Sequence, residues 1–189
     1  PDRALEKTEK TIRGSGDNSF VYHDANNGPP NVLFRNDIAD SKWTFTDVTL
    51  ESGIDVNNRR FSLAASWEDY DNDGDQDLYV PKDYGRYNLY RNDTPPGGEA
   101  RFTDVSNQAS IEDSAGSMAI TWGDYNRDGF MDPFISTMWS SAGNRVTFQS
   151  KFKTDDPEVK KRLQRFAHGN TMLKNNGDGT FSDISEPSG

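Results

Sequence analysis

The sequence of 189 residues contains no cysteine and only two histidines, His23 and His168. Without cysteine the chain cannot form a disulfide framework, a thiolate zinc site or a cysteine nucleophile. Neither histidine belongs to a catalytic motif, and no local signal indicates a Ser-His-Asp arrangement. We therefore expect that the chain is not an enzyme.

Positive charge is also scarce, and no long hydrophobic run is present. Lys and Arg number 21 against 31 Asp and Glu, which gives a formal net charge of −10. Phosphate binding requires a basic patch, so we expect no nucleic-acid partner. No apolar stretch approaches the ~18 residues of a membrane-spanning helix, so we expect no membrane span.

Acidic residues instead gather in two short stretches of similar sequence. Residues 69–77 read DYDNDGDQD and residues 124–132 read DYNRDGFMD. Two carboxylates ~4 Å apart repel each other by about 4 kcal/mol at an effective dielectric near 20. Hard cations relieve such repulsion, and Ca²⁺ accepts six to eight oxygen ligands. Asp, Asn and Gly also form good turns, but the repeated spacing favours metal binding.

Both stretches match the first half of an EF-hand and then depart from it. An EF-hand requires Glu at position 12, where this chain has Val80 and Ile135, and both stretches carry Asp at position 9 instead. The flanking residues are rich in β-branched and aromatic side chains, which are typical of strands. We therefore predict a strand-loop-strand arrangement around each acidic stretch.

The chain as a whole is repetitive. Phe45-Thr46-Asp47-Val48 returns 57 residues later as Phe102-Thr103-Asp104-Val105, and again as Phe181-Ser182-Asp183-Ile184. The middle repeat holds four strand candidates, at 62–67, 76–80, 87–91 and 101–105. Four antiparallel strands form one blade of a β-propeller. We predict an all-β fold of about two and a half such blades.

The repeats also predict the domain organisation. Residues 1–18 form a polar N-terminal arm, and residues 19–189 form the propeller segment. That segment divides into a partial blade at 19–55, which opens with a strand at 19–22, a complete blade at 56–112 and a last blade at 113–189. The last blade contains an insertion at 140–170. Because a propeller needs 4–8 blades, we expect further blades from the same or another chain.

The insertion has the pattern of one short helix. Asp156 and Pro157 are typical of a helix start, and Gly169 of a helix end. Val159, Leu163 and Phe166 form one apolar stripe. Since such a stripe normally faces its own core, we expect the helix to pack on the propeller, with partner binding as the alternative.

The run from Ala65 to Val80, ASWEDYDNDGDQDLYV, resembles the FG-GAP or VCBS repeat, the blade of integrin α-subunit propellers. The runs 140–147 and 167–171, together with the helix between them, resemble the branch that contains cartilage acidic protein and ASPIC/UnbV proteins. The resemblance implies two Ca²⁺ sites. The ligands implied for the first site are the side chains of Asp69, Asp71, Asp73 and Asp77 and the carbonyl of Asp75. Those implied for the second are the side chains of Asp124, Asn126, Asp128 and Asp132 and the carbonyl of Phe130.

The resemblance further implies an extracellular or periplasmic binding or scaffold module, acting in adhesion or protein interaction, in which the metal is structural. Two alternatives remain open: a carbohydrate-binding propeller, and a non-catalytic part of a larger secreted enzyme. The partner would be a protein or a glycan. Trp67 and Trp122 recur at equivalent positions, so we expect them to pack in the core, whereas Trp139 is the better candidate for stacking on a sugar.

Overall fold

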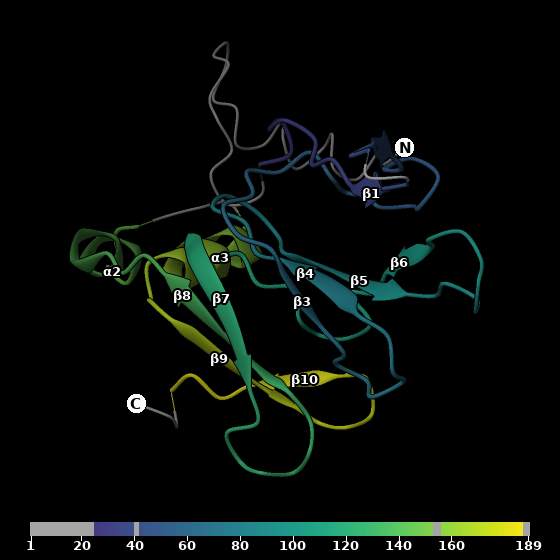
Figure 1. Ribbon diagram of the computed structural model, residues 1–189. Helices are drawn as coiled ribbons and strands as arrows, with labels where there is room; N and C mark the ends of the chain where they lie inside the picture. Colours follow the sequence, from purple (N-terminus) through teal and green to yellow (C-terminus); the bar gives the residue numbers. More distant parts are fainter. Residues whose placement is uncertain (1–24, 40–41, 153–155, 187–189) are drawn as a thin grey trace.

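The computed structural model describes residues 25–39, 42–152 and 156–186, so the arm at 1–18 and the strand expected at 19–22 lie outside the described residues. The described residues form three antiparallel sheets (Figure 1). The first sheet pairs β1 (Phe34–Asn36) with β2 (Phe45–Asp47). The second contains β3 (Ser66–Glu68), β4 (Asp77–Val80), β5 (Asn88–Asn92) and β6 (Phe102–Asp104). The third contains β7 (Ser117–Gly123), β8 (Asp132–Thr137), β9 (Thr171–Asn175) and β10 (Phe181–Asp183).

In both four-stranded sheets each strand pairs with the next one along the chain. This meander is the topology of a propeller blade, and the additional two-stranded sheet is half of one. The predicted all-β fold of two and a half blades is therefore confirmed. The first strand of the middle blade is shorter than predicted, because Ser62 forms only an isolated bridge with Lys82 and regular pairing starts at Ser66.

Packing of the two four-stranded sheets creates the main core. Its centre includes Tyr79 and Leu89 from the middle sheet and Ile135 and Phe181 from the last sheet, all of them buried. Trp122 packs against this cluster, with its ring 5.9 Å from that of Tyr79 in an edge-on arrangement. The sheets therefore meet through aromatic contacts of the kind that favours edge-to-face geometry.

The two recurrent tryptophans differ in their surroundings. Trp122 contacts the neighbouring sheet, as predicted. Trp67 packs on Phe102 of its own sheet at 5.8 Å and remains 44% exposed, so the prediction of a core position for Trp67 was wrong. The cause is that Trp122 lies at the junction of the two four-stranded sheets, whereas Trp67 packs on Phe102, which belongs to a separate and smaller core cluster.

The insertion between β8 and β9 contains two helices, α2 (Ser141–Thr147) and α3 (Pro157–Phe166). Helix α3 is the predicted one: the side chain of Asp156 accepts a hydrogen bond from the N–H of Glu158, and Val159 is buried. The ring of Phe166 stacks on Tyr84 of the middle blade at 5.6 Å. Packing on the propeller, the expected purpose, is thus observed. No helix in the described ranges is long and apolar enough to cross a membrane.

Helix α2 was not predicted from the sequence. It contains Gly143 and Asn144 and ends with β-branched residues, all of which have low helix propensity. The helix is held instead by its surroundings. Ser140 caps its first turn by accepting a hydrogen bond from the N–H of Gly143, and the side chain of Asn144 donates to the carbonyl of Ala167 at the end of α3.

An ion pair ties α3 to the loop before β7. Arg165 donates two hydrogen bonds to the carboxylate of Asp113, Nε to Oδ1 at 3.0 Å and an Nη to Oδ2 at 2.7 Å. The two side chains are 20% and 10% exposed. We expect Arg165→Ala to lower the free energy of unfolding by about 2–3 kcal/mol, slightly less than the loss typical of fully buried pairs.

Urea unfolding at constant CaCl₂ measures this loss. The matched control is Arg35→Ala, which removes the Arg35–Asp37 pair, whose side chains are 44% and 32% exposed, and should change stability by less than about 1 kcal/mol. Equal losses in the two variants would contradict a special role for the Arg165–Asp113 pair.

Candidate metal centre

Each acidic stretch connects the first two strands of a four-stranded sheet. The first acidic loop, residues 69–77, runs from the end of β3 into β4, and the second acidic loop, residues 124–132, runs from the end of β7 into β8. Asp77 and Asp132 are the first residues of β4 and β8. The strand-loop-strand arrangement predicted from the sequence is therefore confirmed in both places, and the last aspartate of each loop is anchored in a sheet.

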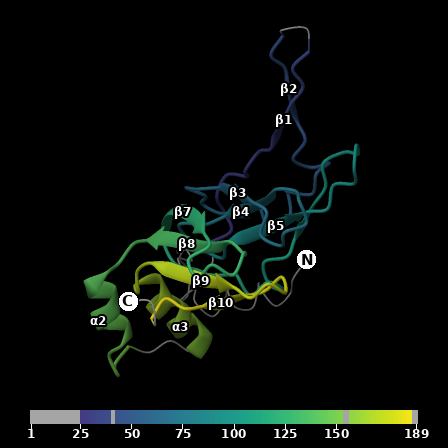
Figure 2. The same cartoon turned by 60° about the horizontal axis from the view of Figure 1, so that its bottom comes forward.

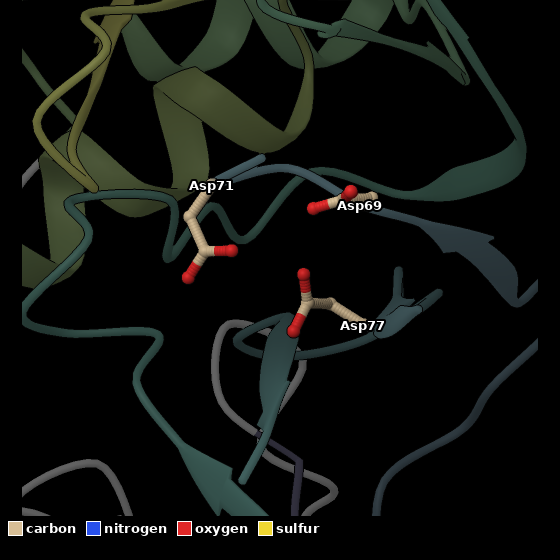
Figure 3. Close-up of side chains that lie close together, drawn as sticks. All are labelled: Asp69, Asp71 and Asp77. Atoms are coloured by element: carbon tan, nitrogen blue, oxygen red, sulfur yellow. The ribbon is translucent and has the colours of Figure 1, made fainter. Parts of the chain in front are cut away.

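Three carboxylates of the first acidic loop converge. Asp69, Asp71 and Asp77 each offer one oxygen, and these three oxygens lie within 4.8 Å of one another. Figure 3 shows their carboxyl groups directed toward a common space. Because Ca²⁺–oxygen distances are about 2.4 Å, oxygens up to about 4.8 Å apart can contact the same ion. The geometry of the three carboxylates therefore fits a single Ca²⁺.

The backbone of the two loops follows the same path. In each loop the first aspartate accepts hydrogen bonds from backbone N–H groups four and five residues later, at 3.1 Å in the first loop and 3.0 Å in the second. Asn72 and Arg127 occupy equivalent positions with φ of 59° and 62°, and both are followed two residues later by a glycine at positive φ. The shared sequence pattern thus encodes one loop conformation, which the glycine makes accessible.

Two carboxylate oxygens of the first acidic loop are buried without a hydrogen-bond partner among the described residues: Oδ1 of Asp71 and Oδ1 of Asp75. Buried polar atoms are normally paired, and an orphaned carboxylate oxygen is the most costly kind. A cation bound among Asp69, Asp71 and Asp77 would supply the missing partner of the Asp71 oxygen. The chemistry of these donors, all oxygens, is the chemistry that Ca²⁺ prefers.

Asp77 is the most buried ligand candidate of the first acidic loop, with 1% exposure. Its carboxylate accepts hydrogen bonds from the N–H groups of Tyr70 at 3.2 Å and Asn92 at 2.8 Å. Burial nevertheless raises the pKa of Asp77 to about 7. Burial also raises the pKa values of Asp71 and Asp75, and the neighbouring charge of Asp73 adds to both shifts. Without a cation the first acidic loop therefore resists full ionisation.

The second acidic loop has one carboxylate fewer among its four predicted side-chain ligands, because Asn126 stands at the position of Asp71. The amide of Asn126 donates to Oδ2 of Asp128 at 2.7 Å. Hydrogen bonds, first from the N–H of Phe130 and then from Asn126, lower the pKa of Asp128. Asp132 is 1% exposed and its pKa is raised by burial, as for Asp77. The carboxylates of the second acidic loop therefore depend less on a cation than those of the first acidic loop.

Of the remaining predicted positions, Asp124 directly follows β7, and Asp73 and Phe130 lie in the bends of their loops. The carboxylate of Asp73 accepts from the N–H of Asp75 at 3.1 Å, and Asp128 accepts likewise from Phe130. Both aspartates are exposed. Asp73 and Asp128 therefore shape the turns of their loops, and the second oxygen of Asp128 accepts the hydrogen bond from Asn126.

Sequence reasoning missed two asparagines that support the loops. Asn92 and Asn175 stand at the ends of β5 and β9, and their N–H groups donate to Asp77 and Asp132, both at 2.8 Å. Their side-chain amides donate to loop carbonyls, that of Gln76 for Asn92 and that of Met131 for Asn175. The recurrence of a basic residue followed by Asn in the repeats, at Arg91-Asn92 and Lys174-Asn175, is the signal that could have identified them.

One comparison with known protein families finds a match, and it covers both acidic loops. The model of the FG-GAP-like repeat family matches residues 69–135, from the first acidic loop through most of β8. This stretch therefore carries an FG-GAP-like repeat. Such repeats are typical of extracellular proteins and often bind Ca²⁺. A search of curated proteins finds no match to the chain.

Proposed function

We propose that this chain is a Ca²⁺-stabilised, non-catalytic binding module of an extracellular or periplasmic protein, with one Ca²⁺ in each acidic loop. The observation that carries the proposal is the convergence of Asp69, Asp71 and Asp77, next to two buried carboxylate oxygens that have no partner among the described residues. The FG-GAP-like repeat at 69–135 supports it. We assign the chain to the branch of cartilage acidic protein and ASPIC/UnbV proteins because the runs 140–147 and 167–171, with the helix between them, resemble that branch.

The proposed role of the metal is structural. Asp69 directly follows β3 and Asp77 begins β4, so an ion held by both joins the ends of two paired strands. The same relation holds for Asp124 and Asp132 at β7 and β8. By neutralising the carboxylates, the ion removes the repulsion that opposes closure of the loop.

The proposed partners are proteins, including further propeller blades from the same or another chain. Large apolar side chains are exposed on the hairpin of β1 and β2: Phe34 at 57%, Trp43 at 74% and Phe45 at 55%. Figure 2 shows this hairpin projecting from the rest of the molecule. Exposed apolar surface of this kind marks interaction sites. A role in adhesion or scaffolding agrees with these features.

A glycan is the second candidate for the ligand. Trp139 is 66% exposed and lies beside the insertion, in an isolated bridge with His168. An exposed indole can stack on a sugar ring. A glycan array with the wild-type chain and with Trp139→Ala tests this alternative, because only Trp139-dependent binding supports it.

Calorimetric titration with CaCl₂ tests the Ca²⁺ sites one at a time. We expect two Ca²⁺ ions per wild-type chain, one in Asp69→Asn and one in Asp124→Asn. The site that remains in Asp124→Asn should bind at least about threefold more tightly than the site that remains in Asp69→Asn, because affinity increases with the number of charged ligands.

Asp178→Asn is the matched control. Asp178 lies in an exposed turn between β9 and β10, outside both acidic loops, and its carboxylate accepts from the backbone N–H and the hydroxyl of Thr180. This variant should bind two ions with unchanged affinities. Equal affinities of the two sites would refute the predicted order, and absence of Ca²⁺ uptake by the wild type would refute the function.

A further inference from the structure

The two acidic loops contact each other directly. The side-chain amide of Asn72 in the first loop donates a hydrogen bond to the carbonyl of Gly129 in the second loop, at 3.1 Å. Asn72 lies at the tip of its loop with φ of 59°, and in the Ca²⁺-binding pattern its side chain is not a ligand. This hydrogen bond joins positions 57 residues apart and makes the conformation of each tip depend on the other.

A second connection runs through a buried asparagine. Asn175 is 1% exposed, and its side-chain amide donates to the carbonyl of Tyr70 in the first loop at 2.8 Å and to that of Met131 in the second loop at 3.2 Å. Its backbone N–H donates to Oδ1 of Asp132 at 2.8 Å. Asn175 therefore supports a candidate ligand of the second loop while its side chain holds the backbone between Asp69 and Asp71.

The path continues to the buried carboxylate of the first loop. Tyr70, whose carbonyl accepts the hydrogen bond from Asn175, donates its own backbone N–H to Oδ2 of Asp77 at 3.2 Å. Tyr70 is 3% exposed, and its ring lies 5.7 Å from that of Phe181 in the last sheet. A continuous series of hydrogen bonds thus leads from Asp132 through Asn175 and Tyr70 to Asp77.

The equivalent asparagine of the middle blade provides a comparison. Asn92 donates to Asp77 and to the carbonyl of Gln76, both in the first acidic loop. In the part of the chain that the structure describes, Asn92 makes no hydrogen bond to a second acidic loop. The two-stranded sheet before the middle blade has no acidic loop among the described residues, so the bridging role of Asn175 is observed at the junction of the two complete blades.

We propose that Asn175 is a positioning residue shared by both acidic loops, and that the two sites bind Ca²⁺ with positive coupling. The inference rests on the proposed function, since it requires an ion in each loop. An ion in the second loop fixes Asp132 and Asn175, and with them the backbone of Tyr70 between two ligands of the first site. An ion bound in one loop therefore orders part of the other site, and the ion that binds there next enters a loop that loses less freedom.

Repulsion between the two ions acts in the opposite direction. The tips of both loops are exposed, so solvent and salt screen this repulsion, whereas the hydrogen bonds through Asn175 are buried and are screened much less. Positive coupling is therefore the expected sign. Because coupling between binding sites is reciprocal, each ion should increase the affinity of the other by the same factor.

The experiment compares each site alone with both sites together. CaCl₂ titrations of Asp69→Asn and Asp124→Asn give the intrinsic affinity of each site. The coupling factor is the product of the two stepwise association constants of the wild type, divided by the product of the two association constants measured in the single-site variants. We expect a factor of about five or more, the lower end of common coupling free energies.

Two matched pairs of variants test the residues that carry the coupling. Each variant is titrated with both sites intact and in combination with Asp69→Asn or Asp124→Asn, so that its own coupling factor can be calculated. Asn72→Gly removes the hydrogen bond between the tips without straining the backbone at positive φ, and Arg127→Gly makes the same change at the equivalent position of the second loop. Asn175→Leu removes the shared amide, and Asn92→Leu removes its counterpart in the middle blade. We expect the coupling factor to fall at least twofold in Asn72→Gly and Asn175→Leu and to remain unchanged in the two controls.

The outcomes separate this inference from the proposed function. Two bound ions with a wild-type coupling factor of one or less would overturn the inference and leave the Ca²⁺ sites intact. A factor that persists in Asn72→Gly and Asn175→Leu would also overturn it. If Asn175→Leu does not fold, the coupling factor of Asn72→Gly, a substitution at an exposed position, is the deciding measurement. No uptake of Ca²⁺ by the wild type would refute the proposed function itself.

Discussion

Removal of Ca²⁺ with a chelator is expected to lower the thermal unfolding midpoint by about 10–20 °C. A ligand that binds only the folded state at 100 times its Kd adds about 2.7 kcal/mol to the free energy of unfolding, so two sites add about 5 kcal/mol. For a chain of this length each kcal/mol shifts the midpoint by about 2–4 °C. Calorimetric scans with 100-fold excess CaCl₂ over Kd and with EGTA measure the difference.

The control for this prediction is the double variant Asp69→Asn/Asp124→Asn, which lacks a ligand in each acidic loop. Its unfolding midpoint should be the same with CaCl₂ and with EGTA. Coinciding curves for the wild type in the two solutions would contradict a structural role for the metal.

The second large effect concerns the pH dependence of stability, which Ca²⁺ is expected to reverse. The pKa of Asp77 in the folded, Ca²⁺-free chain is raised to about 7 by burial, against about 3.9 in the unfolded chain. Between these values the folded state binds more protons than the unfolded state, so the free energy of unfolding falls as pH rises. The total loss attributed to Asp77 between pH 4 and 7 is roughly 4 kcal/mol.

Other titratable groups either add to this fall in the free energy of unfolding or act outside the range from pH 4 to 7. Burial raises the pKa values of Asp71, Asp75 and Asp132 in the same direction. Carboxyl groups with lowered pKa, such as Asp37, are solvent-exposed and contribute little. Burial lowers the pKa of Lys82 to about 7, so the contribution of Lys82 increases stability only as pH rises above 7.

Ca²⁺ should reverse the slope, because the ion binds the ionised carboxylates and competes with protons. Urea unfolding between pH 4 and 7 is therefore expected to show decreasing stability with pH in EGTA and increasing stability with pH in saturating CaCl₂. Parallel pH profiles in the two solutions would show that the ion does not bind these carboxylates.

Much of the fold could be predicted from the sequence because the chain repeats itself. The recurrence of Phe45, Phe102 and Phe181 defined the length of a blade, and the acidic loops fixed where the first two strands of each blade join. Helix α3 was recognisable from Asp156 and Pro157, which encode a helix start locally. Helix α2 was not, because its residues have low helix propensity and its stability comes from contacts with the end of α3.

The candidate site could be predicted as far as local spacing determines it. The alternation of carboxylates specified the loop conformation that both loops share. The roles of Asn175 and Tyr70 depend on how two sheets pack, and residues 105 positions apart in the chain give no local signal of their contact. The exposure of Trp67 was missed for a related reason, since equivalence within the repeat does not ensure equivalent neighbours.

The most direct test of the account is an anomalous difference map from crystals grown with saturating CaCl₂, in which Ca²⁺ is located by its own anomalous scattering. The account predicts one peak in each acidic loop, the first surrounded by oxygens of Asp69, Asp71 and Asp77. Ordered loops without a peak at either position would contradict it.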